Sequence, residues 1–297
     1  MELKVTSLSE KAMLVKLTTR RANLSKRDEH AESIIQQQMD DTSLIVISKL
    51  FRDKNNPINQ LISSINEGYN YHKTHTLPYI DKGPRILPNA MYEEYTTELR
   101  QRISNTESLK LKLMPQYDVF VQQDIKARSA SAIAKGIPPK ASINDYPTAH
   151  EFESRMGFDI RFSPLPDRKH FLFDLSDADV SNFTQAMQDV ERAAHNDAVS
   201  RMLEPLKHLV EKLNKPIGTD GSIFRDTAIE NVVEGCELAK KLLIDASPEV
   251  IGSIDELVTE MTKYHGSWLR ESPVVREQAA KKLDDIARQM GAFMGAV

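Results

Sequence analysis

The sequence is short of cysteine, glycine and long apolar runs, and each shortage excludes a class of protein. The single cysteine, Cys236, excludes an internal disulfide framework and is typical of a reducing cytoplasm. Because Cys236 lies within a helical pattern, we expect it to be a small core residue rather than a nucleophile. The 11 glycines among 297 residues disfavour an all-β fold rich in tight turns. No apolar run is long enough to span a bilayer, and the first residues, MELKVTSLSEK, lack the pattern of a signal peptide. We therefore expect a cytoplasmic protein with no membrane contact.

Motifs of catalysis and cofactor binding are also missing. The chain has no GxxxxGKS/T phosphate loop, GxGxxG turn, HExxH or CxxC pair. His72 and His75 could share a helical face, but no further metal ligand stands at a suitable spacing. His150 and His195 are each followed by an acidic residue within two positions, a pattern more typical of solvated helix faces than of acid–base catalysis. We therefore expect no enzyme activity, no metal and no cofactor.

Helical periodicity is the commonest pattern that is present. Apolar residues recur at steps of three and four from Asn56 onward, where Pro57 suits a first helical turn, and from Asn89 to about Lys135, where Pro115 should divide the helix. A β-rich stretch at residues 12–21 predicts a first strand. We expect a helix to begin at Ser25.

The later part of the chain predicts one hairpin followed by long helices. Alternating aromatic and aliphatic residues at 158–162 and 171–173 indicate a β-hairpin. Apolar heptad spacing then runs through residues 180–213, and the pairs Ser247-Pro248 and Ser272-Pro273 mark two further helix starts. The expected fold class is mainly α, with long helices, helical hairpins and a small β-hairpin element, and no five-stranded OB barrel. We expect two portions, residues 1–175 and 176–297, packed as one unit.

Charge is distributed unevenly along the chain. Residues 1–140 hold 21 Lys and Arg against 16 Asp and Glu, a net +5, whereas residues 141–297 hold 18 against 27, a net −9. Such asymmetry is expected where a basic half meets an anionic partner, although uneven scatter of charges would give the same count.

Basic and aromatic residues gather in two stretches of the basic half. TTRRANLSKR (18–27) supplies cations that could follow phosphates, and YNYHKTHTLPYIDKGPRILP (69–88) combines such cations with flat rings on which unpaired bases could stack. The alternative is that the second stretch is an elbow between helices, with tyrosines that fill the core beneath it. The candidate nucleic-acid-binding residues are Arg20, Arg21, Lys26, Arg27, Tyr69, Tyr71, His72, Lys73, Lys82 and Arg85.

Two segments carry a resemblance to a known family. THTLPYIDKGPRILPNAMYEEY (74–95) is similar to the TLPW…G.RLLP…Y..Y signature of an uncharacterised family of helical phage and bacterial proteins, and SINDYPTAHEFESRMGFDIRFSPLPD (142–167) resembles its DYP…L…F…F.P.P segment. Tyr79 stands where that family usually has tryptophan. The resemblance implies that TLPY…RILP is structural, with Tyr79 in place of a buried tryptophan. The residues that remain the main candidates for binding a ligand are then YNYHK (69–73) and the arginines at 20 and 21.

The chain also resembles the single-stranded-DNA-binding RNA polymerase cofactors of podoviruses that carry a virion RNA polymerase, in its size, its helical character and its basic-aromatic stretch. This implies an oligomeric phage protein in the host cytoplasm that binds single-stranded DNA and supports phage RNA polymerase in transcription, or acts in replication. The alternative is a non-enzymatic adaptor or assembly protein. Members of the first family are often encoded near MoxR-type AAA ATPases, and such a partner would contact the heptads of residues 180–213.

Overall fold

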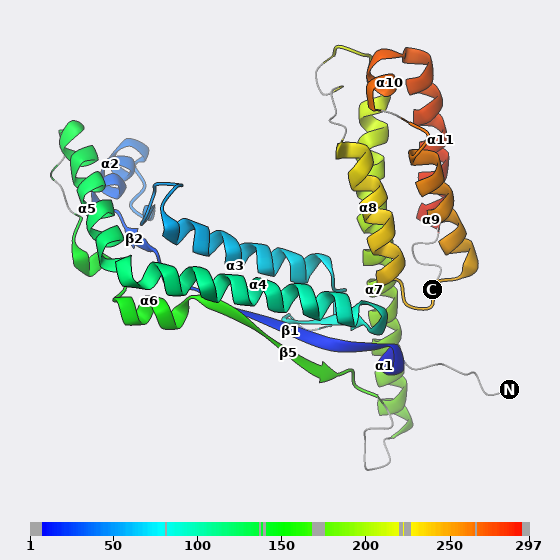
Figure 1. Ribbon diagram of the computed structural model, residues 1–297, viewed down its shortest axis with the longest axis horizontal. Coiled ribbons are helices and arrows are strands. Elements are labelled where there is room, and N and C mark those ends of the chain that lie inside the picture. The colour runs from blue at the N-terminus through cyan, green and yellow to red at the C-terminus, as the bar shows by residue number, and fades with distance from the viewer. Residues whose placement is uncertain are drawn as a thin grey trace. The chain divides into compact units, whose positions relative to one another are not determined.

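The computed structural model describes residues 8–80, 82–136, 138, 141–167, 176–219, 222, 227–264 and 266–292 (Figure 1). The chain forms two compact units, and neither is continuous in sequence. Unit 1 comprises Met1–Lys16, Lys73–Tyr95 and Arg161–Val297, and unit 2 comprises Leu17–His72 and Thr96–Ile160. The predicted boundary at residue 175 lies outside the described residues.

Helices predominate, as the sequence predicts, and the β-structure of the described residues is limited to one three-stranded and one two-stranded sheet. The larger sheet has the order β4-β1-β5, with β1 at Ala12–Arg20, β4 at Pro84–Pro88 and β5 at Gly157–Pro164. β1 and β4 are antiparallel, in a register that pairs Ala12 with Pro88 and Lys16 with Pro84. The predicted strand at 12–21 is confirmed, and so is the first strand of the predicted hairpin. Its second strand, at 171–173, lies outside the described residues.

The expected helix at Ser25 is wrong, because this segment pairs with a later one. Strand β2 (Ser25–Arg27) is antiparallel to β3 (Ile47–Lys49). Helix α2 (Glu29–Met39) begins only afterwards, where the Asp28 side chain accepts a hydrogen bond from the Ala31 N–H as an N-cap. Pairing with β3 thus overrides a local signal for a helix start.

The helices that follow lie mainly in unit 2, although the last two residues of α3 and the first four of α4 belong to unit 1. The predicted start of α3 at Pro57 is confirmed, with Asn56 accepting a hydrogen bond from the Ile58 N–H. Pro115 lies in a 3₁₀ turn that divides the long helical stretch, also as predicted. Figure 1 shows α3 and α4 side by side, and a 2.5 Å hydrogen bond joins Ser64 Oγ of α3 to Thr106 Oγ1 of α4. The bounds are α3 Pro57–Thr74, α4 Tyr92–Leu113, η2 Met114–Gln116, α5 Tyr117–Ala134, η3 Ile143–Asp145 and α6 Ala149–Arg155.

An aromatic cluster forms the core around α5. Phe51 packs edge-on against Tyr146 with ring centroids 5.2 Å apart, and Tyr117 packs on Phe152 at 4.7 Å. The buried carboxylate of Asp124 accepts hydrogen bonds from the Phe51 N–H at 3.0 Å and from the Tyr146 hydroxyl at 2.6 Å. These bonds hold the segment after β3 against α5, which positions one wall of the groove described below.

Unit 1 is built on α7, which packs against α8 and α11 (Figure 1). The second part of the predicted heptad pattern, Val199 to Leu213, is buried in this core. Gly235 of α8 permits close helix packing, because a Cβ there would lie 3.2 Å from the Arg201 carbonyl oxygen of α7. The bounds are α1 Leu8–Lys11, η1 Asn89–Met91, α7 Asp177–Leu213, α8 Thr227–Leu242, α9 Pro248–Met261, α10 Gly266–Glu271 and α11 Pro273–Ala292.

Two sequence expectations for this unit are confirmed in detail. Ser247 and Ser272 accept hydrogen bonds from the Val250 and Val275 N–H groups at the starts of α9 and α11. Cys236 is fully buried in the core, and burial raises the pKa of its thiol to about 12. A thiol that stays protonated at neutral pH is a poor nucleophile.

A buried arginine closes the C-terminal end of α7. Arg276 of α11 donates to the Leu213 carbonyl at 2.8 Å, to the Ser222 carbonyl at 3.0 Å and to the Lys212 carbonyl. Burial lowers the pKa of Arg276. The guanidinium satisfies carbonyl groups that the end of a helix leaves without intrahelical donors. Its charge also complements the negative end of the helix dipole.

Among the described residues, none of the helices is both long and apolar enough to cross a membrane. The same residues contain no group of three or more His, Cys, Asp or Glu side chains placed to hold a metal ion.

Candidate nucleic-acid interface

A groove of about 730 Å³ in unit 2 brings together cationic side chains from distant parts of the sequence. Its walls come from β2, the start of α2, the segment after β3, the end of α5 and the segment from α5 to η3. Three carboxylates, Asp28, Glu29 and Asp145, also line it, together with His30. The five cationic residues of the lining are Lys26, Arg27, Arg52, Arg128 and Lys135.

The two lining cations that the sequence predicts, Lys26 and Arg27, are both engaged with carboxylates. Lys26 Nζ lies 2.7 Å from Asp145 Oδ2. Burial acts to raise the pKa of Asp145, but the hydrogen bonds from Lys26 and the Ser142 N–H outweigh it and the pKa is lowered. Arg27 forms a two-pronged pair with the buried Glu32 and lowers the pKa of that carboxyl. Both positive charges are thus largely neutralised inside the protein.

Arg52 and Arg128 differ, because the acceptors that hold them are neutral. Arg128 donates to the Lys49 carbonyl at 2.8 Å and to Ser48 Oγ at 3.2 Å. Arg52 donates to the same Ser48 Oγ and, at 3.4 Å, to the Lys49 carbonyl. A guanidinium has five N–H donors, so each arginine keeps donors for a further acceptor. Two oriented guanidinium groups that converge on one serine form a suitable site for a phosphate, which arginine binds in a bidentate manner.

Sequence reasoning missed Arg52, Arg128 and Lys135. Arg128 of α5 and Lys135, the C-cap of the same helix, lie seven residues apart and therefore share a face with Ser131 and Ala132. This seven-residue spacing is the sequence pattern from which Arg128 and Lys135 could have been predicted as neighbours. Nothing local marks Arg52, which reaches the groove because β3 pairs with β2.

The other predicted residues of unit 2 do not line the groove. Arg20 is paired with Asp159 at 2.7 Å, and Arg21 is exposed. Tyr69 is 45% exposed.

The next residues of α3 are less accessible. Tyr71 is half-buried, with the Arg102 guanidinium 4.7 Å from its ring centroid. His72 is buried, so its ring presents no face on which a base could stack. Of the predicted stacking residues in YNYHK, Tyr69 is therefore the one whose position suits a ligand.

Lys73, Lys82 and Arg85 belong to unit 1. The side chains of Lys73 and Lys82 are exposed. Arg85 is instead bound to the segment after α3, donating to Thr76 Oγ1 at 2.7 Å and to the Thr76 carbonyl at 2.8 Å. Its main interactions are therefore with the protein's own chain.

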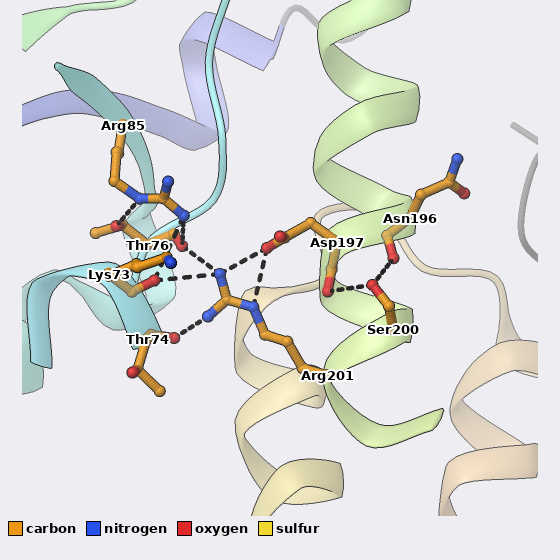
Figure 2. Close-up of polar contacts among 8 residues, drawn as sticks. All are labelled: Lys73, Thr74, Thr76, Arg85, Asn196, Asp197, Ser200 and Arg201. Atoms are coloured by element: carbon orange, nitrogen blue, oxygen red, sulfur yellow. Dashed lines mark hydrogen bonds and ion pairs between the residues drawn. The ribbon is translucent and has the colours of Figure 1, made fainter. Parts of the chain in front are cut away.

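Figure 2 shows a second arginine that reaches the same carbonyl groups from α7. Arg201 donates to the Thr76 carbonyl at 2.7 Å and to the carbonyl of Thr74, the last residue of α3. Asp197, one helical turn earlier, accepts from Arg201 at 2.6 Å and orients it. Arg85 and Arg201 together satisfy the carbonyl groups around the end of α3.

The family-like segments TLPY and RILP bind each other. Leu77 and Ile86 exchange backbone hydrogen bonds of 2.8 and 2.9 Å, and Arg85 adds its bonds to Thr76. Tyr79 is half-buried. These contacts agree with a structural role for the segment, and they make it an elbow between α3 and β4.

Comparisons of the chain with protein-family models, with curated proteins and with solved structures found no match. We therefore infer the function from the groove and its charges.

Proposed function

We propose that the protein is a non-catalytic single-stranded DNA-binding protein, and that the unit 2 groove holds the sugar-phosphate backbone. The observation that carries the proposal is the pair Arg52 and Arg128, positioned by Ser48 and Lys49 without a carboxylate partner in the bonds that hold them. Neither arginine would have to release a carboxylate hydrogen bond to bind a phosphate, and Lys135 adds a further positive charge to the groove.

A binding event of this kind involves an exchange of partners at the groove. A phosphate near Lys26 would compete with Asp145, so part of the attraction offsets the loss of an existing ion pair. Arg52 and Arg128 would lose no such pair. They should therefore contribute most of the electrostatic affinity, and the exposed ring of Tyr69 is a candidate for base stacking, worth roughly 1–3 kcal/mol.

The adaptor alternative receives less support from the fold. Of the predicted heptad residues 180–213, the later ones, such as Val199, Leu206 and Leu213, lie in the core of unit 1, whereas Val180, Phe183 and Met187 are only half-buried. A contact through the later residues would require that core to open, so an adaptor contact would have to use the first part of α7.

The test is a fluorescence-anisotropy titration of the full chain with labelled oligothymidine and with duplex DNA, at about 50 mM and about 200 mM salt. We expect tighter binding to the single strand, and affinity that falls steeply with salt because phosphate contacts release counterions. Equal affinity for both DNA forms, or no binding at the lower salt, would contradict the proposal.

A matched pair of double variants assigns the site. Arg52→Gln with Arg128→Gln removes two groove charges, and we expect at least about a tenfold loss of affinity, or about 1.4 kcal/mol. Arg100→Gln with Arg155→Gln removes two exposed charges of the same unit that do not line the groove. Equal losses from both doubles would show that overall charge, rather than the groove, determines binding.

A further inference from the structure

Unit 1 contains a separate cavity of about 370 Å³, which is within the size range of small-molecule sites, about 300–1,000 Å³. It lies where the α8–α9 connection meets α7. Glu191, His195, Asp245 and Ser247 supply its polar groups. Its apolar wall is formed by buried side chains of α1, the segment after α3, α7, α8 and α9, namely Leu8, Leu77, Ala194, Leu242 and Val250.

Two carboxylates and one histidine line this cavity, and among the described residues its lining includes no lysine or arginine. Lys11 forms an ion pair with Asp245, so its charge is already matched. Glu191, one turn before His195 on α7, has no ion pair within the described part of the chain. Burial and the nearby charge of Asp245 raise the pKa of Glu191, and Lys11 opposes that shift only in part.

The backbone at Asp245 is also unusual. Its φ of 55° lies in the left-handed region, which non-glycine residues seldom adopt. Asp tolerates this conformation better than most residues, and here the conformation belongs to a cavity-lining residue that is paired with Lys11.

We propose that this cavity binds a small organic amine, with the protonated amine against Glu191 and an apolar body against Leu242, Val250 and Ala194. An anion would meet the Glu191 carboxylate, and a neutral apolar molecule would gain no attraction from it. A metal ion is disfavoured, because Glu191, His195 and Asp245 are not grouped as metal ligands in the structure. The proposal is independent of DNA binding, since every residue that lines the cavity belongs to unit 1 and every residue that lines the groove belongs to unit 2.

The experiment compares three probes of similar size and different charge with the full chain by ligand-observed saturation-transfer NMR. The probes are 2-phenylethylamine, 2-phenylethanol and 3-phenylpropanoate. We expect the amine to bind at least about tenfold more tightly than the alcohol, and the carboxylate not to bind. Equal signals from amine and alcohol, or no signal from the amine, would overturn the proposal.

Two variants locate the site. Glu191→Gln keeps the shape of the side chain and removes its charge, and we expect about a tenfold weaker amine affinity. Ala246→Phe fills the cavity from a half-buried lining position and should abolish binding of the amine. Amine binding that is unchanged in both folded variants would place it elsewhere and contradict the assignment. Single-strand affinity, measured on the same samples, should be unchanged.

Discussion

Arginine serves two different purposes in the two units. In unit 2, Arg52 and Arg128 lie at a groove, and the neutral groups that orient them leave their charge available. In unit 1, Arg201 and Arg276 are directed at backbone carbonyl groups, where they close the ends of α3 and α7. The first pair creates a surface for an anion, and the second pair stabilises helix ends.

The difference shows that a count of basic residues does not locate a binding surface. What matters is the acceptor that each guanidinium faces: a carboxylate neutralises it, a helix end occupies it, and a lone serine hydroxyl orients it while leaving donors for a ligand. The two hollows differ as well, because cations outnumber carboxylates in the lining of the groove, whereas the cavity of unit 1 has two carboxylates, a histidine and an apolar wall.

The largest expected effect is on unit 1. Arg276→Met should lower the free energy of unfolding by about 2–4 kcal/mol, because several buried carbonyl groups lose their donor at once. Chemical denaturation measures the loss. Arg288→Met is the control: it removes an exposed arginine of the same helix, and a surface ion pair is worth at most about 1 kcal/mol. A similar small change in both variants would contradict the helix-closing role of Arg276.

A smaller effect on stability should distinguish Tyr69 from Tyr71, which lie two residues apart in the sequence. Tyr71→Ala should destabilise the protein by about 1–2 kcal/mol, because a half-buried ring and its contact with Arg102 are lost. Tyr69→Ala should change stability by less than about 0.5 kcal/mol, since its ring is exposed. If the ring of Tyr69 stacks on a base, the same variant should weaken single-strand binding without a change in the urea midpoint. A stable Tyr71→Ala variant would show that this ring is not part of the core.

The smallest expected effect concerns the acidic cavity. A Glu carboxyl whose pKa is raised in the folded state reduces stability as the pH rises above its unfolded pKa, because folding then opposes ionisation. Glu191→Gln should therefore raise the melting temperature at pH 7 by about 1–3 °C and leave it nearly unchanged near pH 4. The exposed Glu230→Gln is the control and should have no effect at either pH. Thermal melts at the two pH values measure the difference. A melting temperature of Glu191→Gln below that of the unaltered protein at pH 7 would show that the charge of Glu191 does not destabilise the fold.

Local signals allowed much of the helical fold to be predicted. The Asn56-Pro57 start, the break at Pro115 and the Ser-Pro starts at 247 and 272 all depend on neighbouring residues. The Ser25 helix start failed because a strand later in the chain pairs with that segment. The groove depends on such long-range pairing, and so only Lys26 and Arg27 of its five cations were found from sequence. Arg85 was predicted as a ligand residue because a sequence does not show which carbonyl groups a guanidinium will meet.

The most direct test of this account is to compare Arg128→Gln with Arg201→Gln in the full chain, measuring melting temperature and single-strand affinity on the same samples. Arg128→Gln should weaken binding severalfold with little change in melting temperature. Arg201→Gln should lower the melting temperature, through lost donors at Thr74 and Thr76, and leave affinity unchanged. Weaker DNA binding by folded Arg201→Gln together with unaltered binding by Arg128→Gln would contradict the division of roles between the two units.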